Sequence, residues 1–424
     1  MISKFRAFLG RRHNVRAHLW QTLANYTQHI GGIILGIILA RILQPSDFGK
    51  FAYAQSIVLL AQQPISWNLS QALLATRCQD RKLVADAWHL ETWVFTCKLF
   101  VSIALSLFFY FRNDHTLALL VLVCGIPSAI DGFTNLLRAE IDSSGNFKAH
   151  FFSNSLTVLI CIAIGVPLAL NGFGPLAIAL PGIPLLFLQP ILYKFFTPLD
   201  LQRPIRWKRV SLAPLRSGSS LWLCSASEQA VFRLDKILLG KFTTPESLGN
   251  YNRAYGYAPI SHFALSSLYT NPTIAALIQK TDWTSKKRIL TNHTWILIPA
   301  GIANAIFWYF FADPVVPLVF GQQWRPAIPV FQAMSTLSLC MAAYYLPSAY
   351  LFHASDYFAL GLIRCLVVLA MLLIGLLIGD QLKATTMALL LQSSLIFTSI
   401  LLILRCTVLI LRKKSAFNNS VPFT

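Results

Sequence analysis

Long apolar stretches recur along almost the whole chain, and they constrain its fold more than any other feature. Each is about 20 residues long, which is enough to cross the hydrocarbon core of a bilayer. Of the 424 residues, 55% are hydrophobic and only 12% are charged. Such stretches are expected to be helices, because every backbone polar group in a bilayer must be satisfied internally. The chain is therefore predicted to be an all-α polytopic membrane protein, which excludes most soluble enzyme scaffolds.

Two segments of the chain repeat one another at an offset of 200 residues. Residues 37–54 have the sequence IILARILQPSDFGKFAYA, and residues 237–254 have the sequence ILLGKFTTPESLGNYNRA. Each copy joins the end of one apolar stretch to the start of another. We interpret the repeat as an internal duplication, which is typical of transporters built from two related bundles. A helix–turn–helix connector that recurs by chance is the alternative.

Twelve membrane spans are predicted, six in each half. The spans run near 17–42, 49–74, 91–111, 116–138, 149–170 and 173–196, and then near 213–240, 248–276, 290–312, 326–351, 356–379 and 384–410. They define an N-terminal six-helix bundle over 17–196 and a C-terminal six-helix bundle over 213–410. The remaining parts are an interfacial segment over 1–16, a basic linker over 197–212 and a tail over 411–424. Pro64 lies within the second span and is predicted to kink it.

The distribution of basic residues predicts the orientation of the chain. The formal net charge of +19 at first suggests a nucleic-acid partner. With the amino terminus in the cytoplasm, however, 23 of the 35 Lys and Arg residues fall in inside segments and 7 in outside ones. This positive-inside bias explains the charge without any nucleic acid, and it places both termini in the cytoplasm. Spans one and seven then start on the same side, so the two bundles are predicted to be parallel repeats.

No motif in the chain indicates a catalytic site, a metal site or a cofactor. The eight cysteines are scattered and form no CxxC pair. Nearly all of them fall inside apolar stretches, which is typical of small core residues rather than a disulfide framework.

Charged residues within the predicted spans need a reason, because a charge near the bilayer centre costs at least about 2.5–3.5 kcal/mol. Lys98 and Arg364 lie about two turns from the cytoplasmic end of their spans, where snorkelling to the interface is the simple alternative to a ligand site. Arg233 and Lys236 flank Asp235, and a local salt-bridge cluster is the alternative there.

Two acidic residues lie deeper in their spans, Asp131 in the fourth and Glu228 in the seventh. Asp235 follows Glu228 by seven residues, on the same face of a continuous helix. A carboxylate at such depth is protonated, paired or in contact with water. Two interpretations stay open. One is cation-coupled transport, and the other is a paired charge that ties two helices together, as Glu228 would with Arg364.

The inner halves of spans one and seven are unusually polar. At the offset of 200, Asn25 corresponds to Ser225 and Gln28 corresponds to Glu228, and His29 follows Gln28. Helices that face lipid would not carry these groups. They either pack through hydrogen-bonding residues or line a wet cavity, and we favour a shared cavity lined by Asn25, Gln28, His29 and Ser225.

Several stretches resemble a known family. Residues 39–74, LARILQPSDFGKFAYAQSIVLLAQQPISWNLSQALL, resemble the start of bacterial polysaccharide flippases, which belong to the MOP exporter superfamily and are relatives of the MATE multidrug transporters. In that family the first long helix ends in a LARxLGPxxFG connector and the second runs on to a G(L)SQAL stretch. Here Gln44 stands where the family often has glycine. Residues 235–255, 268–279 and 311–330 also resemble family segments, so the resemblance covers both halves.

The resemblance implies a MATE-like fold with two bundles around a cationic cavity. It also implies a flippase that moves undecaprenyl-pyrophosphate-linked repeat units across the bacterial inner membrane, by alternating access, for O-antigen, capsule or exopolysaccharide synthesis. A pyrophosphate needs basic partners away from bulk water. The candidates for head-group binding are Arg233, Lys236, Arg364 and Lys98, and those for ion coupling are Glu228, Asp131 and Asp235. The implied partners are the lipid-linked oligosaccharide, membrane lipids, H⁺ or Na⁺, and a polysaccharide polymerase with its chain-length protein.

Two other classes remain as alternatives. A multidrug or small-solute cation antiporter of the same superfamily would share the fold, the repeat and the acids. A membrane-embedded polysaccharide polymerase or ligase would share the composition, but it is expected to carry a large periplasmic loop with catalytic basic residues. The longest outer loop expected here, near 312–325, is too short for that.

Overall fold

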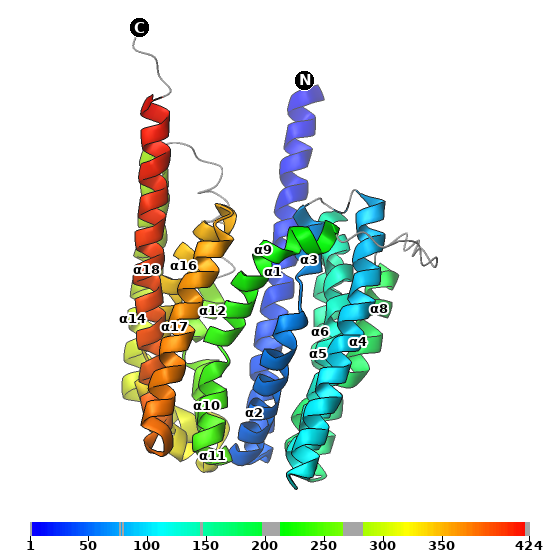
Figure 1. Cartoon of the computed structure of the whole chain (residues 1–424), viewed down its shortest axis with the longest axis vertical. Coiled ribbons are helices and arrows are strands. Elements are labelled where there is room, and N and C mark those ends of the chain that lie inside the picture. Colours follow the sequence, from blue (N-terminus) through cyan, green and yellow to red (C-terminus); the bar gives the residue numbers. More distant parts are fainter. Residues whose placement is uncertain are drawn as a thin grey trace. The chain divides into compact units, whose positions relative to one another are not determined.

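The computed structural model describes residues 2–75, 78, 80–144, 147–196, 213–265 and 283–419, which are helical apart from short connections (Figure 1). Eight helices in these ranges are long and apolar enough to cross a membrane. A ninth span results if the bent pair Gln322–Ala333 and Leu337–Phe352 is counted as one. The all-α, multi-pass architecture predicted from the sequence is thus confirmed. The predicted linker over 197–212 lies outside the described residues.

The chain divides into two compact units, and each is described by itself. The first contains Met1–Trp222, Thr244–Gly249 and Leu318–Gln323, and the second contains Leu223–Thr243, Asn250–Pro317 and Trp324–Thr424.

The helices of the first unit overlap the six predicted spans, but two of them begin ten or more residues earlier and two spans are interrupted. They are α1 (Ile2–Ile42), α2 (Pro45–Gln62), η1 (Gln63–Ile65), α3 (Leu69–Ala75), α4 (Arg81–Phe111), α5 (His115–Ser144), α6 (Phe147–Leu170), α7 (Leu176–Ala179) and α8 (Gly182–Phe196). α1 packs along α6, and α4 packs along α5 (Figure 1). The segment over 1–16 is continuous with the first span, since α1 runs from Ile2 without a break.

The second predicted span is interrupted at Pro64, as the position of this proline predicts. α2 ends at Gln62, and a short 3₁₀ turn and an irregular segment precede α3. Gln62 is 2% exposed. Its Nε2 donates to the Oγ of Ser102 at 2.7 Å, and its Oε1 accepts from the Oγ of Ser128 at 2.6 Å. Because Ser102 lies on α4 and Ser128 on α5, one buried amide joins three helices beside the break.

The two copies of the repeat form the same local structure. Two residues separate the end of α1 from the start of α2 at Pro45, and two residues likewise separate α10 (Leu234–Phe242) from α11 (Pro245–Tyr257). Proline suits the first position of a helix, because the N–H that it lacks would have no partner there. The repeat in the sequence therefore corresponds to a repeat of helix end, turn and helix start.

The repeated connectors also contact each other, within the first unit, at a close backbone crossing. A Cβ added to Gly49 would overlap the carbonyl oxygen of Pro245, and a Cβ added to Gly249 would overlap the carbonyl oxygen of Pro45. The contact is reciprocal, since the glycine of each copy faces the proline of the other. Only a residue without a side chain allows two helices to approach so closely.

The second unit contains the end of α9 (Ala213–Val231), α10, most of α11, α12 (Ile260–Leu265), most of α14 (Trp283–Phe320), the end of η3 (Gln322–Ala327), α15 (Ile328–Ala333), α16 (Leu337–His353), α17 (Tyr357–Ile378), η4 (Gly379–Gln381) and α18 (Ala384–Asn419). α18 packs along α16 and α17 (Figure 1).

The outer loop expected near 312–325 is wrong over its first part. Residues 312–320 continue α14, although Pro314 and Pro317 lie within this stretch. Each proline removes one helical donor. Val316 and Phe320 are 0% and 1% exposed, and the burial of these apolar side chains offsets the lost hydrogen bonds.

The glycine crossing yields a test of stability. Gly49→Ala or Gly249→Ala should lower the free energy of unfolding by about 1–3 kcal/mol, because the new methyl group meets backbone atoms that cannot move aside. Gly256→Ala in α11 is the matched control, since a Cβ there meets nothing within 4 Å. Thermal unfolding of the purified variants in detergent measures the difference. Equal melting temperatures for the Gly49 and Gly256 variants would contradict the close crossing.

Candidate functional site

A partly buried ion pair lies in the second unit. Arg364 of α17 is 2% exposed, and its Nη1 lies 3.3 Å from the Oε2 of Glu228 on α9. Nη1 also donates to the backbone oxygen of Cys224 at 3.1 Å. The guanidinium lies over the ring of Tyr344, 5.2 Å from its centroid. The pair that the sequence offered as an alternative to a coupling site is therefore formed, and Arg364 is held by these partners rather than extended to the surface.

The two members of this pair differ in exposure. The side chain of Glu228 is 36% exposed, whereas that of Arg364 is 2% exposed. The Nε of Arg364 is buried and has no hydrogen-bond partner in the part of the chain that the structure describes. The site thus combines an accessible carboxylate with a buried cation that keeps one donor unused.

Arg364 reaches α9 because the two helices touch one turn away. A Cβ on Gly361 would lie 2.8 Å from the Cγ of Leu223 and 3.2 Å from the backbone nitrogen of Cys224. Gly361 and Arg364 are three residues apart and share a face of α17. The glycine lets α17 approach α9, and the arginine then spans the remaining gap.

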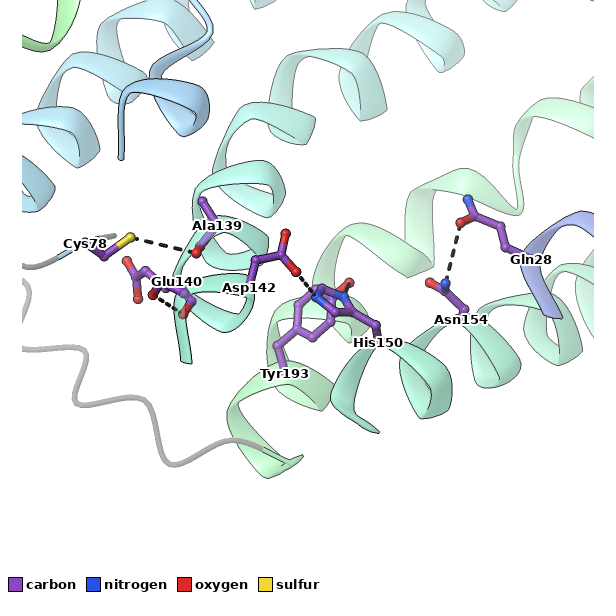
Figure 2. Close-up of polar contacts among 9 residues, drawn as sticks. Gln28, Cys78, Ala139, Glu140, Asp142, His150, Asn154 and Tyr193 are labelled. Carbon is purple, nitrogen blue, oxygen red and sulfur yellow. Dashed lines mark hydrogen bonds and ion pairs between the residues drawn. The ribbon is translucent and has the colours of Figure 1, made fainter. Parts of the chain in front are cut away.

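The first unit contains a similar arrangement made of uncharged groups (Figure 2). Asn154 of α6 is 7% exposed. Its Nδ2 donates to the backbone oxygen of Ala24 at 3.1 Å and to the Oε1 of Gln28 at 3.5 Å, both on α1. An amide on the fifth span therefore binds the first span at one backbone carbonyl and at the side chain one turn later.

These two arrangements correspond position by position. Asn154 contacts Ala24 and Gln28, and Arg364 contacts the residues 200 positions later, at 224 and 228. Asn154 and Arg364 each lie seven residues after the first residue of their helix. Asn154 was not among the predicted site residues, because the polar positions matched at the offset of 200 all lie in the first span of each half. Its place near the start of the fifth span, matching that of Arg364 in the eleventh, was the available signal.

The predicted seventh span is two helices rather than one. α9 ends at Val231, and α10 begins at Leu234. The expectation that Glu228 and Asp235 share a face of one continuous helix is therefore wrong, because the break interrupts the helical period. Phe232 lies at the break. Its ring lies 5.5 Å from that of Tyr344 and stacks on that of Tyr345 at 6.0 Å.

Arg233 lies at this break, at the N-cap position of α10 with φ −128°. Its side chain is half-buried. It forms no hydrogen bond or ion pair with any residue in the described ranges. Among the four predicted head-group cations, Arg233 is thus the one that is both half-buried and without a hydrogen-bonded partner in the described structure, and a helix N-terminus adds to the attraction of this position for anions.

Asp235 and Lys236 pair with each other in a closed cluster. The Nζ of Lys236 lies 3.3 Å from the Oδ2 of Asp235 and 3.6 Å from the ring centroid of Tyr255. The hydroxyl of Tyr251 donates to the same Oδ2 at 2.7 Å. Asp235 is 0% and Lys236 2% exposed. This is the local cluster that the sequence offered as the alternative to a ligand site, except that Arg233 forms no bond in it.

Lys98 and Asp131 lie in the first unit with an acid that the sequence analysis did not single out. Lys98 is 7% exposed, and the charges of Glu91 and Asp131 both act on it. Glu91 is 5% exposed, and its Oε1 has no hydrogen-bond partner among the described residues. Asp131 is exposed and accepts from the Nδ2 of Asn135 at 2.9 Å. Glu91 was missed because the predicted span began at it, whereas α4 begins ten residues earlier.

The residues predicted to line a cavity differ in exposure. Asn25 and Ser225 are half-buried, whereas Gln28 and His29 are exposed. Within the described ranges no group of three or more metal-ligating side chains occurs.

Figure 2 also shows a polar cluster that joins α5, α6 and α8. The Nε2 of His150 lies 2.8 Å from the Oδ1 of Asp142, and its Nδ1 lies 3.4 Å from the hydroxyl of Tyr193. Tyr193 is 0% exposed. The cluster connects one end of these three helices, near the uncharged arrangement on α6.

Comparisons with known proteins place these features in a family. A family model described as "Polysaccharide biosynthesis protein" matches residues 38–329. The chain is 23% identical over 341 residues to the lipopolysaccharide biosynthesis protein WzxC of Escherichia coli (strain K12). The matched region covers 78% of this chain and 68% of that protein.

Solved structures show the same fold. The lipid II flippase MurJ in an inward closed conformation has a TM-score of 0.68 at 11% identity, over 92% of this chain and 87% of that one. An inward-facing multidrug resistance MATE family transporter of the MOP superfamily has a TM-score of 0.64 at 14% identity, over 95% and 96%. The MATE-like fold implied by the resemblance is therefore confirmed.

The buried pair can be tested with a double-mutant cycle of Glu228→Leu, Arg364→Leu and both together. Glu228→Leu alone should destabilise more than the double variant, because it leaves the guanidinium buried without a counter-charge. The coupling energy should be about 1–3 kcal/mol. The same cycle at Arg405 and Asp356, a more exposed pair with an N–O distance of 2.7 Å, should give less than about 1 kcal/mol. Melting temperatures measure both, and additive effects at Arg364 and Glu228 would contradict the pairing.

Proposed function

This chain belongs to the polysaccharide biosynthesis protein family, and from that premise we propose that it is a flippase for undecaprenyl-pyrophosphate-linked oligosaccharide units. It is a multi-pass membrane protein with the MATE-like fold. On this proposal it moves repeat units across the bacterial inner membrane by alternating access, with both termini in the cytoplasm. The units serve O-antigen, capsule or exopolysaccharide assembly, and a polymerase with its chain-length protein takes them over in the periplasm.

The observation that carries the proposal is the buried guanidinium of Arg364, in a helix long and apolar enough to cross a membrane. Phosphate oxygens are preferred partners of a guanidinium because they accept two parallel hydrogen bonds. Nη1 is shared between the backbone of Cys224 and Glu228, and Nε is left without a partner among the described residues. A pyrophosphate would use the free donor and replace the carboxylate of Glu228.

Arg233 is the second proposed head-group residue. It lies in the same unit as Arg364, at the break between α9 and α10, and its guanidinium has no bonded partner in the described ranges. Lys236 is already neutralised by Asp235, and Lys98 lies with two acids in the other unit. We therefore assign head-group binding to Arg364 and Arg233, and a supporting electrostatic role to the two lysines.

For ion coupling we propose the group around Lys98. Glu91 has a buried carboxyl oxygen without a donor in the described structure, and Asp131 is exposed nearby on α5. Burying such a group as an unpaired charge is costly, so a proton or Na⁺ bound there in one conformation and released in the other is a suitable coupling ion. Asp235 is a poorer candidate because Lys236 and Tyr251 already occupy its carboxylate.

The head-group assignment predicts a loss of export. Arg364→Leu and Arg233→Leu should each lower surface polysaccharide at least about tenfold, because a hydrogen bond to a charged group contributes about 1.5–3 kcal/mol. The amount of inserted protein should be unchanged. Arg112→Leu is the control, since Arg112 lies over the ring of Phe108 at the exposed end of α4. Normal export by both variants would show the assignment to be wrong.

The same cells separate the competing classes of function. Deleting the gene should cause single lipid-linked units to accumulate on the cytoplasmic side. Normal flipping with shortened polymer would instead indicate a polymerase or ligase. Unchanged polysaccharide together with altered drug sensitivity would indicate a multidrug antiporter.

The coupling assignment predicts a loss of gradient dependence. In proteoliposomes, Glu91→Gln should abolish the stimulation of flipping by an imposed pH or Na⁺ gradient, because an amide keeps the shape but cannot exchange a cation. Glu140→Gln is the control, since that carboxylate accepts the Nε1 of Trp88 at 3.0 Å. Full stimulation of the Glu91 variant would leave Asp131 and Glu228, which the matching amide substitutions then test.

A further inference from the structure

One face of α1 is polar and exposed within a helix that can span a membrane. Asn25, Gln28, His29 and Gly32 lie at positions i, i+3, i+4 and i+7, which share one face of a helix. Gln28, His29 and Gly32 are exposed, and a Cβ on Gly32 would meet nothing within 4 Å. The span itself covers Thr22–Ile42. Polar side chains that faced lipid would forfeit their hydrogen bonds, so this face is expected to contact water or a ligand.

The position of Gln28 on this face is set by a buried neighbour. Asn154 donates to the backbone oxygen of Ala24 and to the Oε1 of Gln28. Because the Oε1 of Gln28 is turned towards Asn154, its amide nitrogen points away from α6, as Figure 2 shows. Gln28 thus presents two N–H donors in a direction that Asn154 determines.

The chemistry of this face is uncharged. Residues 22–40 contain no Lys, Arg, Asp or Glu. An amide and an imidazole offer both donors and acceptors, as sugar hydroxyls do, whereas a pyrophosphate requires cations. At the corresponding positions of the second unit the same geometry holds a charged pair, Arg364 with Glu228. The two halves therefore offer different chemistry at equivalent places.

We propose that this face of α1 binds the sugars of the substrate, with Gln28 in contact with sugar hydroxyls and Asn154 as the residue that positions it. The proposal rests on the flippase function, and it assigns recognition of the neutral glycan to this face of the first unit.

Binding to the full-length protein in lipid nanodiscs tests this assignment with two probes. One is a polyprenyl pyrophosphate without sugar, and the other is the same carrier with a neutral disaccharide. Gln28→Leu should weaken binding of the glycosylated probe about tenfold and leave the bare carrier within about twofold. Gln189→Leu is the matched control, because Gln189 is another amide in a span of the first unit, bonded to Thr157 at 3.3 Å. It should leave both affinities unchanged.

A second variant tests the positioning role. Asn154→Asp replaces the donor that holds the Oε1 of Gln28 by an acceptor, which should turn the Gln28 amide over. Binding of the glycosylated probe should fall while the bare carrier still binds. Equal affinity of the Gln28 variant and the wild type for both probes would overturn the inference, and so would a parallel loss of both probes.

The proposed function fails in a different way. Arg364→Leu should weaken both probes, because both carry the pyrophosphate. A wild-type protein that binds neither probe would overturn the flippase proposal and this inference together. If the wild type binds both probes and Gln28→Leu binds the glycosylated probe as tightly as the wild type does, only the inference is overturned.

Discussion

In each half of this protein, a side chain on the fifth span binds a backbone carbonyl of the first span, and the chemistry of both halves depends on this bond. Helices in a bilayer gain little from the hydrophobic effect when they pack, so polar contacts and close approach hold them together. The same bond brings the donor beside the residue one turn later on the first span. An asparagine donor is therefore matched by a glutamine, and an arginine donor by a glutamate. Arginine opposite glutamine would leave a buried charge unpaired, and this constraint explains why the two positions differ together.

The charged half is also the half in which the first helix is broken. α1 is continuous, whereas the corresponding stretch of the second half stops at Val231 and resumes at Leu234. The break places Arg233 at a helix N-terminus, next to the pair of Asp235 and Lys236. Because Lys236 neutralises Asp235, the local field at the break is set by Arg233 and by the positive end of the α10 helix dipole. Both features favour an anion, as does Arg364 in the same unit.

Much of the fold follows from the sequence, because helices that span a bilayer must be long and apolar, and such stretches are visible in the composition. The break at Pro64 and the repeated helix starts at Pro45 and Pro245 were predictable for the same local reason. The break after Val231 was not, since no proline or glycine marks it. Phe232 at the break packs on two tyrosines more than 100 residues away, a contact that the local sequence does not reveal. The partner of Arg364 could be named as Glu228 because a buried cation needs an acid. Asn154 carries no charge and gave no comparable signal.

The pairing of Arg364 with Glu228 also bears on how a flippase could release its substrate. A lone buried guanidinium would bind a pyrophosphate too tightly for transport, because nothing would replace the substrate when it leaves. With Glu228 as an internal ligand, binding is an exchange of one anion for another, and the net gain is only the difference between them. Since Glu228 is the more exposed member, an incoming phosphate meets the carboxylate first and is repelled by it. When the substrate leaves, Glu228 pairs with Arg364 again. On the proposed function, therefore, this ion pair keeps head-group binding reversible, and the uncharged pair in the other half has no such role.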